Sequence, residues 1–109
     1  MPHLRFRAVN SEVVQTLSST LPQELSQTMN TDADNFTFES VATDFFSNGQ
    51  ATSSYPFVEV LWFERTQEVQ NLSATVITDH VKKLTAAQDV VVVFIALNKK
   101  AYYENGKHF

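Results

Sequence analysis

Two long stretches of the sequence carry an apolar side chain every three or four positions, the spacing of one face of an α-helix. Pro22 falls inside the first stretch, where an interior proline costs about 3 kcal/mol. The apolar stripe continues in register beyond it, so we predict one kinked helix with Pro22 on its outer side. The stripes consist of Val14, Leu17, Leu21, Leu25 and Met29, and of Val69, Leu72, Val76, His80 and Leu84.

Four shorter stretches have the pattern of β-strands. Residues 3–9 and 36–42 alternate apolar and polar side chains, which predicts strands with one buried face. Residues 58–64 are also strand-like, and residues 90–97 are apolar throughout, as expected for a strand covered on both faces. The predicted order is therefore strand, helix, strand, strand, helix, strand.

The two halves of the chain resemble each other. Residues 11–21 (SEVVQTLSSTL) and 66–76 (TQEVQNLSATV) share several identities at a separation of 55, read as 66 minus 11. The same separation aligns Ser11 with Thr66, both favourable helix N-caps, and aligns the strand-like segments. We interpret this pattern as an internal duplication of a β-α-β unit.

The duplication predicts an α/β fold for a single domain spanning 1–109, with repeat one at about 3–42 and repeat two at about 57–97. Each unit is expected to contain two parallel strands joined by a right-handed crossover through a helix. Together the two units predict a four-stranded sheet with both helices on one face.

The other face of this sheet has nothing in the chain to cover it. We expect Leu4 and Phe6 to face the helices in the first unit, and Leu61 and Phe63 in the second. An apolar sheet face is unfavourable in water, so we expect an oligomer that covers it, with Trp62 shielded at the interface. The segment 43–55 is expected to form a short strand on a neighbouring subunit. The side chains predicted on the uncovered face are Arg5, Arg7, Val58, Val60 and Trp62.

Composition and charge exclude several classes of protein. The chain has 109 residues, a net charge of −4 and no cysteine, which excludes disulfides and thiolate metal sites. No Lys or Arg lies between Arg7 and Arg65, so the basic stripe that nucleic acid needs is absent. The longest apolar run, Val90 to Leu97, is too short to cross a bilayer. Because no secretory pattern is visible either, we expect a cytoplasmic protein without membrane contact.

Pro2 directly precedes the first strand, and together with the doubled β-α-β plan this start resembles the tautomerase superfamily. That superfamily includes macrophage migration inhibitory factor and 4-oxalocrotonate tautomerase. The segments MPHLRFR, YPFVEVLWFER and AYYENGKHF more closely resemble an uncharacterised bacterial family placed in it. The resemblance implies a homotrimer with pockets between subunits, removal of Met1, and Pro2 as the catalytic base.

The chemistry of a terminal proline agrees with that role. A free α-amino group titrates near pH 8, and an apolar pocket lowers its pKa because burial disfavours the charged ammonium. A base with a pKa near the working pH is efficient, so Pro2 could move a proton next to a carbonyl in a keto–enol tautomerisation of a small carboxylic acid. If Met1 is retained, Pro2 is an amide without a basic nitrogen and this function is lost.

The sequence departs from the superfamily at the cation that holds a substrate carboxylate. The first predicted helix has no Lys or Arg, and the approach to the second strand reads NTDADN. The cation must therefore be Arg5, Arg7, Arg65 or a late lysine, although Arg65 is equally suited to an ion pair. The pairs Lys82–Lys83 and Lys99–Lys100 are most simply surface charges.

Tyr102 and Tyr103 precede a predicted turn at Gly106 that leads into a short last strand. They are expected to pack on a neighbouring subunit, or to donate a hydrogen bond to a developing enolate. We interpret His80 as a hydrogen-bonded, partly buried histidine. His3 and His108 have no metal-ligand spacing, so neither a metal nor another cofactor is expected.

Two further classes of protein remain open. One is a non-catalytic trimer that serves as a binding or interaction module on the same fold, which the NTDADN segment favours. The other is a ferredoxin-like ligand-binding domain, which has the same order of elements. Pro2 and the segment 43–55 between the repeats favour the tautomerase plan.

Overall fold

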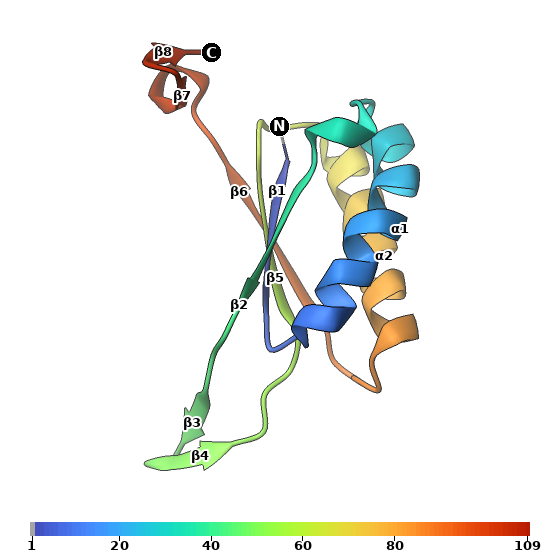
Figure 1. The fold of residues 1–109 in the computed structure, drawn as a ribbon, viewed down its shortest axis with the longest axis vertical. Coiled ribbons are helices and arrows are strands. Elements are labelled where there is room, and N and C mark those ends of the chain that lie inside the picture. The colour runs from blue at the N-terminus through green and yellow to red at the C-terminus, as the bar shows by residue number, and fades with distance from the viewer. Residues whose placement is uncertain (1) are drawn as a thin grey trace.

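The computed structural model describes residues 2–109 and has two helices packed on one face of a four-stranded sheet (Figure 1). A short 3-10 helix, η1 (Ala33–Asn35), leads into the second strand. The first unit contains β1 (His3–Arg7), α1 (Ser11–Met29) and β2 (Thr37–Val41). The second contains β5 (Phe57–Trp62), α2 (Gln67–Leu84) and β6 (Val91–Ala96).

The strand order in the sheet is β2-β1-β5-β6. Within each unit the two strands are parallel, and the units meet through the antiparallel pair β1 and β5. This arrangement confirms the predicted fold class, a duplicated β-α-β unit with both helices on one face.

Each unit is followed by a small hairpin with the same turn sequence. The turns at Asn48-Gly49 and Asn105-Gly106 have positive φ at both residues, the type I′ geometry for which Asn-Gly is favoured. The hairpins extend from opposite ends of the sheet, on the side away from the helices (Figure 1). They consist of β3 (Phe45–Ser47) with β4 (Gln50–Thr52), and of β7 (Tyr103–Glu104) with β8 (Lys107–His108), after a second 3-10 helix, η2 (Lys99–Ala101).

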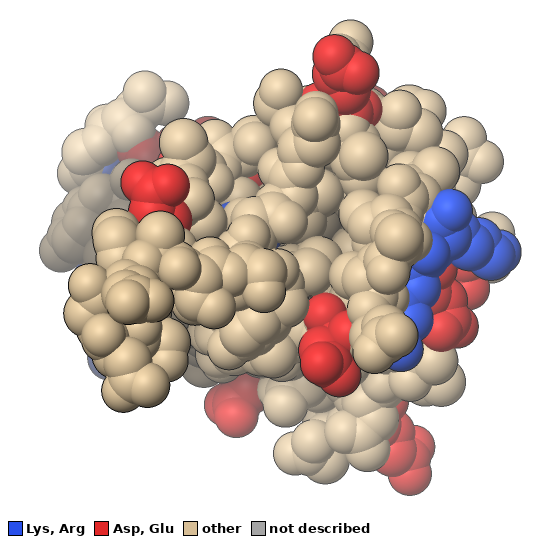
Figure 2. All heavy atoms as spheres, turned by 90° about the horizontal axis from the view of Figure 1, so that it is seen from below, with Lys and Arg blue, Asp and Glu red and all other residues tan. Residues whose placement is uncertain are grey.

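The C-terminal hairpin confirms the predicted turn and last strand. In the 43–55 segment, β3 and β4 pair with each other, and pairing with a neighbouring subunit stays a prediction. Figure 2, seen from the β3–β4 end, shows this hairpin nearest the viewer at the left, with few charged atoms. Residues 45–58 contain no charged side chain, so the hairpin is a polar but uncharged projection.

The core between sheet and helices corrects the predicted orientation of β5. Val58, Val60 and Trp62 are buried in this core. In the pairing of β1 with β5, Val58 lies opposite Phe6 and Val60 lies opposite Leu4. The sequence-based expectation that Trp62 lies on the uncovered face, at an oligomer interface, is therefore wrong. Leu61 faces away from the helices together with Phe57 and Glu59, because side chains alternate along a strand.

The cause is a shift of one residue in the repeat. Phe6 stacks on Phe38, and Trp62 contacts Phe94 with its ring tilted by 41°, which gives a separation of 56 (62 minus 6, and 94 minus 38). The helix N-caps Asn10 and Thr66 are also 56 apart, so the expected N-cap Ser11 is instead the first residue of α1. A slip of one residue moves every strand side chain to the other face, which explains the inverted β5.

The same shift changes the buried stripe of α2. Leu17 is fully buried, but Leu72, which the 55-residue separation aligns with it, is 60% exposed. The residue that follows, Ser73, lies in the core in its place, and Leu84 at the end of the predicted stripe is exposed as well. The buried residues of α2 are Ser73, Val76, Ile77 and Val81.

Helix α1 runs through Pro22 without interruption, which confirms a single helix. Pro22 is buried beside Leu21 rather than on the outer side, because the buried arc of α1 is wider than one row of side chains. The helix ends at Asn30, whose left-handed backbone lets its N–H donate to the carbonyl of Ser26. Among residues 2–109, neither helix is both long and apolar enough to span a membrane.

The sheet face opposite the helices, called the open face below, is uncovered within residues 2–109. Strand β6 is therefore covered on one face rather than two, and Val93 and Ile95 are each 37% exposed. The open face carries His3, Arg5 and Arg7 of β1, Thr37, Glu39 and Val41 of β2, Phe57, Glu59 and Leu61 of β5, and Val91, Val93 and Ile95 of β6.

Candidate functional site

Pro2 lies at the end of the sheet where β1 begins and where β5 and β6 end, called the Pro2 end below (Figure 1). Its side chain is fully buried, and its carbonyl accepts the N–H of Thr37 at 3.1 Å. Continuing the β1–β5 register by one residue sets Pro2 opposite Trp62, since His3 pairs with Leu61. The proline therefore lies, buried, directly before a central strand.

Arg65 lies at the same end of the sheet, in the short link between β5 and α2. Its Nε donates to the carbonyl of Met29 at 3.2 Å and its Nη1 donates to the carbonyl of Phe63 at 2.7 Å. Its guanidinium carbon lies 5.1 Å from the centre of the Trp62 ring. Burial lowers the pKa of Arg65 from its usual value. The cation thus caps the C-terminus of α1, where the helix dipole favours positive charge.

Arg65 makes none of the ion pairs found among residues 2–109, so the ion pair considered as one of its two alternatives is not formed there. Because a guanidinium carries five N–H donors and two point at backbone carbonyls, donors remain for an anion. Arg65 is thus a partly buried cation with N–H donors available for an anion such as a carboxylate.

A cavity of about 520 Å³ opens beside Arg65. The ammonium of Lys99 lies 5.5 Å from the centre of the Phe63 ring, so a second cation borders the same cavity. Lys99 is exposed, as expected for a surface charge, but its place beside the cavity was not predicted. The cavity is lined by Met29, Asn30, Phe63, Glu64, Arg65, Leu97 and Lys99.

The C-terminal segment folds over the Pro2 end and forms an aromatic cluster. Phe63, Tyr102 and Phe109 contact one another with ring centres 5.0–5.4 Å apart. Tyr102 also borders a smaller cavity of about 300 Å³, together with His3, Thr37, Leu61 and Leu97. Tyr103 is 62% exposed on β7 and contacts His108 instead. Of the two predicted tyrosines, only Tyr102 is thus placed at the cavities of the Pro2 end.

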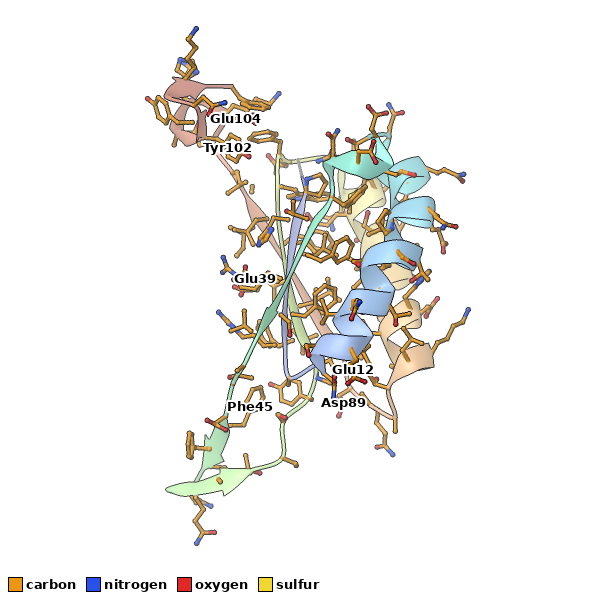
Figure 3. All side chains as sticks on the ribbon, viewed as in Figure 1. Glu12, Glu39, Phe45, Asp89, Tyr102 and Glu104 are labelled. Carbon is orange, nitrogen blue, oxygen red and sulfur yellow. The ribbon has the colours of Figure 1, made fainter. Side chains whose placement is uncertain are left out.

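A polar cluster on the open face adjoins the smaller cavity. The Nδ1 of His3 lies 2.6 Å from the hydroxyl of Thr37, and its Nε2 lies 2.8 Å from a carboxylate oxygen of Glu39. The Nε of Arg5 donates to the same oxygen at 3.2 Å. Figure 3 shows Glu39 on the side of the sheet away from the helices. Hydrogen bonds from His3 and Arg5 hold the pKa of the Glu39 carboxyl below its usual range.

The other candidate cations lie on the same face and are engaged by carboxylates. Arg5 and Arg7 reach Glu59 at 3.5 and 3.1 Å, and the hydrogen bond to Glu39 raises the pKa of Arg5. These contacts leave Arg65 and Lys99 as the candidate cations that border the larger cavity.

Sequence reasoning did not predict that Thr37 and the ring of His3 belong to the candidate site. Both are found only once the pairing of β1 with β2 is known, because His3 and Thr37 are partners in that register. The reading of His80 is confirmed, since its Nε2 lies 3.0 Å from a carboxylate oxygen of Glu24 in α1. No group of three His, Asp or Glu side chains within residues 2–109 is placed to hold a metal ion.

The fold is shared with proteins of known structure. A structure described as "F6 fused 4-OT wild type asymmetric trimer", where 4-OT stands for 4-oxalocrotonate tautomerase, matches with a TM-score of 0.84 at 14% identity. The match covers 97% of this chain and 94% of that one. It confirms, at the level of the fold, the resemblance to the tautomerase superfamily. No sequence among the curated proteins is significantly similar to the chain.

Two structures are similar in sequence as well. A protein of unknown function from Vibrio cholerae is 48% identical with a TM-score of 0.87, and the match covers 99% of this chain and 87% of that one. A domain of unknown function from Sebaldella termitidis is 40% identical with a TM-score of 0.92, and both chains are covered completely. The latter is described as DUF1904, and the model of that family matches residues 1–108 here. The chain therefore belongs to the family described as Domain of unknown function (DUF1904).

Proposed function

We propose that this protein catalyses the keto–enol tautomerisation of a small carboxylic acid, with Pro2 as the general base once Met1 has been removed. The observation that supports this function best is Arg65, a partly buried cation without a carboxylate partner among residues 2–109, at the same end of the sheet as Pro2. A substrate carboxylate bound there would neutralise the positive charge of Arg65.

The surroundings of Pro2 favour a basic nitrogen near neutral pH. The side chain is buried next to the apolar core, and burial lowers the pKa of an α-amino group because the ammonium loses its hydration. The likeness to fused 4-OT adds support by analogy of fold.

The remaining parts of the site suit a small planar acid. The free N–H groups of Arg65 would hold the carboxylate, and Lys99 would add a second positive charge at the mouth of the cavity. The cluster of Phe63, Tyr102 and Phe109 would form an apolar wall for the rest of the molecule.

Substitution of the cations tests this assignment. Arg65→Gln should raise KM for phenylpyruvate about 10- to 100-fold, since a hydrogen bond to a charged group contributes about 1.5–3 kcal/mol. Lys99→Gln should raise KM by a smaller factor, and Lys82→Gln, an equally exposed lysine on α2, should leave KM unchanged. An unchanged KM in Arg65→Gln would show that the carboxylate binds elsewhere.

We further propose that the working unit is a homotrimer, as in the fused 4-OT structure. The open face carries the exposed apolar side chains Val93 and Ile95. The arginines and glutamates of this face already form ion pairs with one another, so a neighbouring subunit could cover the face without burying an unpaired charge. Phe46 and Tyr103, at 70% and 62% exposure, extend beyond the sheet on the two hairpins, where a neighbouring subunit would bury them. A stable monomer in sedimentation equilibrium at micromolar concentration would contradict this assembly.

A non-catalytic trimer that binds a partner is the second candidate. The observation that favours it is the acidic link from Asn30 to Asn35 before β2, which carries Asp32 and Asp34 and no cation. A Met-free protein that forms trimers but turns over neither arylpyruvates nor dienols would favour this function.

A further inference from the structure

We propose that Thr37, His3 and Glu39 form a proton relay that donates a proton to the substrate oxygen while Pro2 removes one from carbon. The inference rests on the proposed tautomerase function and adds the acid that the reaction needs. Thr37 and Glu39 project from the same face of β2, and His3 projects beside them from β1.

The two ring nitrogens of His3 have different partners. An ionised carboxylate only accepts hydrogen bonds, so the Nε2 at 2.8 Å from Glu39 must carry a proton. Glu39 stays ionised because His3 and Arg5 hold the pKa of its carboxyl below the usual range. The Nδ1 then faces the Thr37 hydroxyl at 2.6 Å and can either accept a proton from it or donate one to it.

The relay is connected to both Pro2 and a cavity. His3 follows Pro2 in the chain, and the amide N–H of Thr37 donates to the Pro2 carbonyl at 3.1 Å. His3 and Thr37 are also the polar side chains, beside Tyr102, in the cavity of about 300 Å³ that Leu61 and Leu97 otherwise line. A substrate carbonyl in this cavity would lie beside the Thr37 hydroxyl, which is exposed in the single subunit, and next to the apolar side chains of Leu61 and Leu97.

The protons balance in the keto-to-enol direction. The Pro2 nitrogen takes a proton from the carbon next to the carbonyl, the C–H electron pair forms the C=C bond, and the carbonyl π pair moves to oxygen. That oxygen takes the Thr37 hydroxyl proton, and the Thr37 oxygen takes the Nδ1 proton of the His3 imidazolium. Thr37 touches the substrate, while His3 and Glu39 are positioning residues that act through it. The reverse reaction restores each proton.

The fold itself does not require these three side chains. At the positions 56 residues later, the second unit has Glu59, Val93 and Ile95 in place of His3, Thr37 and Glu39. Strands β5 and β6 pair in the same parallel way without a hydroxyl–imidazole–carboxylate chain. A purely structural role would therefore predict little effect of removing the Thr37 hydroxyl.

The test compares Met-free variants in the enolisation of phenylpyruvate. Thr37→Val and His3→Gln should lower kcat about 10²- to 10⁴-fold, the range for general acid–base catalysis, with little change in KM. Thr37→Ser should restore most of kcat, because it returns the hydroxyl. The matched control is Thr75→Val, a threonine exposed on α2. The parent and Thr37→Ser should show a solvent deuterium isotope effect on kcat that Thr37→Val lacks.

Three results are possible. A loss of kcat in Thr37→Val that Thr37→Ser rescues, in variants that melt like the parent, supports the relay. A kcat in Thr37→Val and His3→Gln equal to that of Thr75→Val overturns the relay and leaves Pro2 as the only acid–base group. An inactive Met-free parent overturns the proposed tautomerase function, and the relay with it.

Discussion

The two ends of the sheet contain equivalent cavities with different chemistry. The cavity at the far end, called the Ala8 end, has a volume of about 540 Å³, and the one at the Pro2 end about 520 Å³. The duplication relates four residues of each lining at a separation of 56. Ala8, Val9, Val41 and Thr43 at one end correspond to Glu64, Arg65, Leu97 and Lys99 at the other.

The difference teaches that the backbone makes a hollow at each end, whereas side-chain substitution supplies charge at one end only. Val9 and Thr43 offer no cation where Arg65 and Lys99 do. The counterpart of Pro2 is Val58, whose nitrogen is an amide inside β5 and cannot become a base. Pro2, which the proposed function makes an amine once Met1 is removed, and Arg65, a cation without a carboxylate partner among residues 2–109, thus lie at the same end of the sheet.

The largest predicted effect tests whether Trp62 and Phe6, at equivalent positions of the two units, are buried in the same core. Trp62→Ala and Phe6→Ala should each lower the free energy of unfolding by about 3–5 kcal/mol, because both rings are buried at equivalent positions. Urea unfolding followed by circular dichroism measures both values. A loss below about 1 kcal/mol for Trp62→Ala would contradict its place in the core of the single subunit.

A smaller effect sharpens the 56-residue correspondence. Ser73 stands where the first unit has Leu17, is fully buried, and its hydroxyl has no hydrogen-bond partner among residues 2–109. Ser73→Ala should raise the free energy of unfolding by about 1 kcal/mol, because an unsatisfied buried hydroxyl is removed. Leu72→Ser, at the neighbouring exposed position, should change it by less than about 0.5 kcal/mol. If Leu72→Ser changed the stability in thermal melts more than Ser73→Ala, the correct separation of the repeats would be 55 rather than 56.

The smallest effect concerns the charges of the first unit. The pKa of Glu39 is lowered in the folded protein, so the unfolded carboxyl binds its proton first as the pH falls. The stabilisation is complete above the ordinary carboxyl value of 4.5 and is lost as the pH falls through the lower folded value. Glu39→Gln should therefore show a shallower loss of stability below that value, whereas a slope equal to the parent's would mean that the contacts with His3 and Arg5 contribute nothing. The second unit has Ile95 at this position, which cannot titrate.

The architecture could be predicted from the sequence because helix stripes, strand alternation and the doubled order are local patterns. The orientation of β5 could not, because the identities between the repeats lie on the helices and are offset by one residue from the structural correspondence. The position of Trp62 on one face or the other depends on that single residue. The predicted stripe of α2 assumed that apolar residues are buried and polar residues are exposed. Ser73, which is buried, and Leu72, which is exposed, do the opposite.

The candidate site was predictable only in part. Pro2 and Arg65 were found through residue type and resemblance, and the structure places both at one end of the sheet. Thr37 and Lys99 were not, because their places depend on strand pairing and on the path of the chain after β6, which no local pattern encodes.

The most direct test is the enol-to-keto conversion of arylpyruvates and dienols by protein whose N-terminus is Pro2, compared with the same protein retaining Met1. Our account predicts turnover by the Met-free protein and a loss of about 10²- to 10⁴-fold when Met1 is present, because acylation removes the basic nitrogen. Pro2→Ala keeps a primary amine and should lie between the two. Equal activity with and without Met1 would contradict the claim that the Pro2 nitrogen is the base.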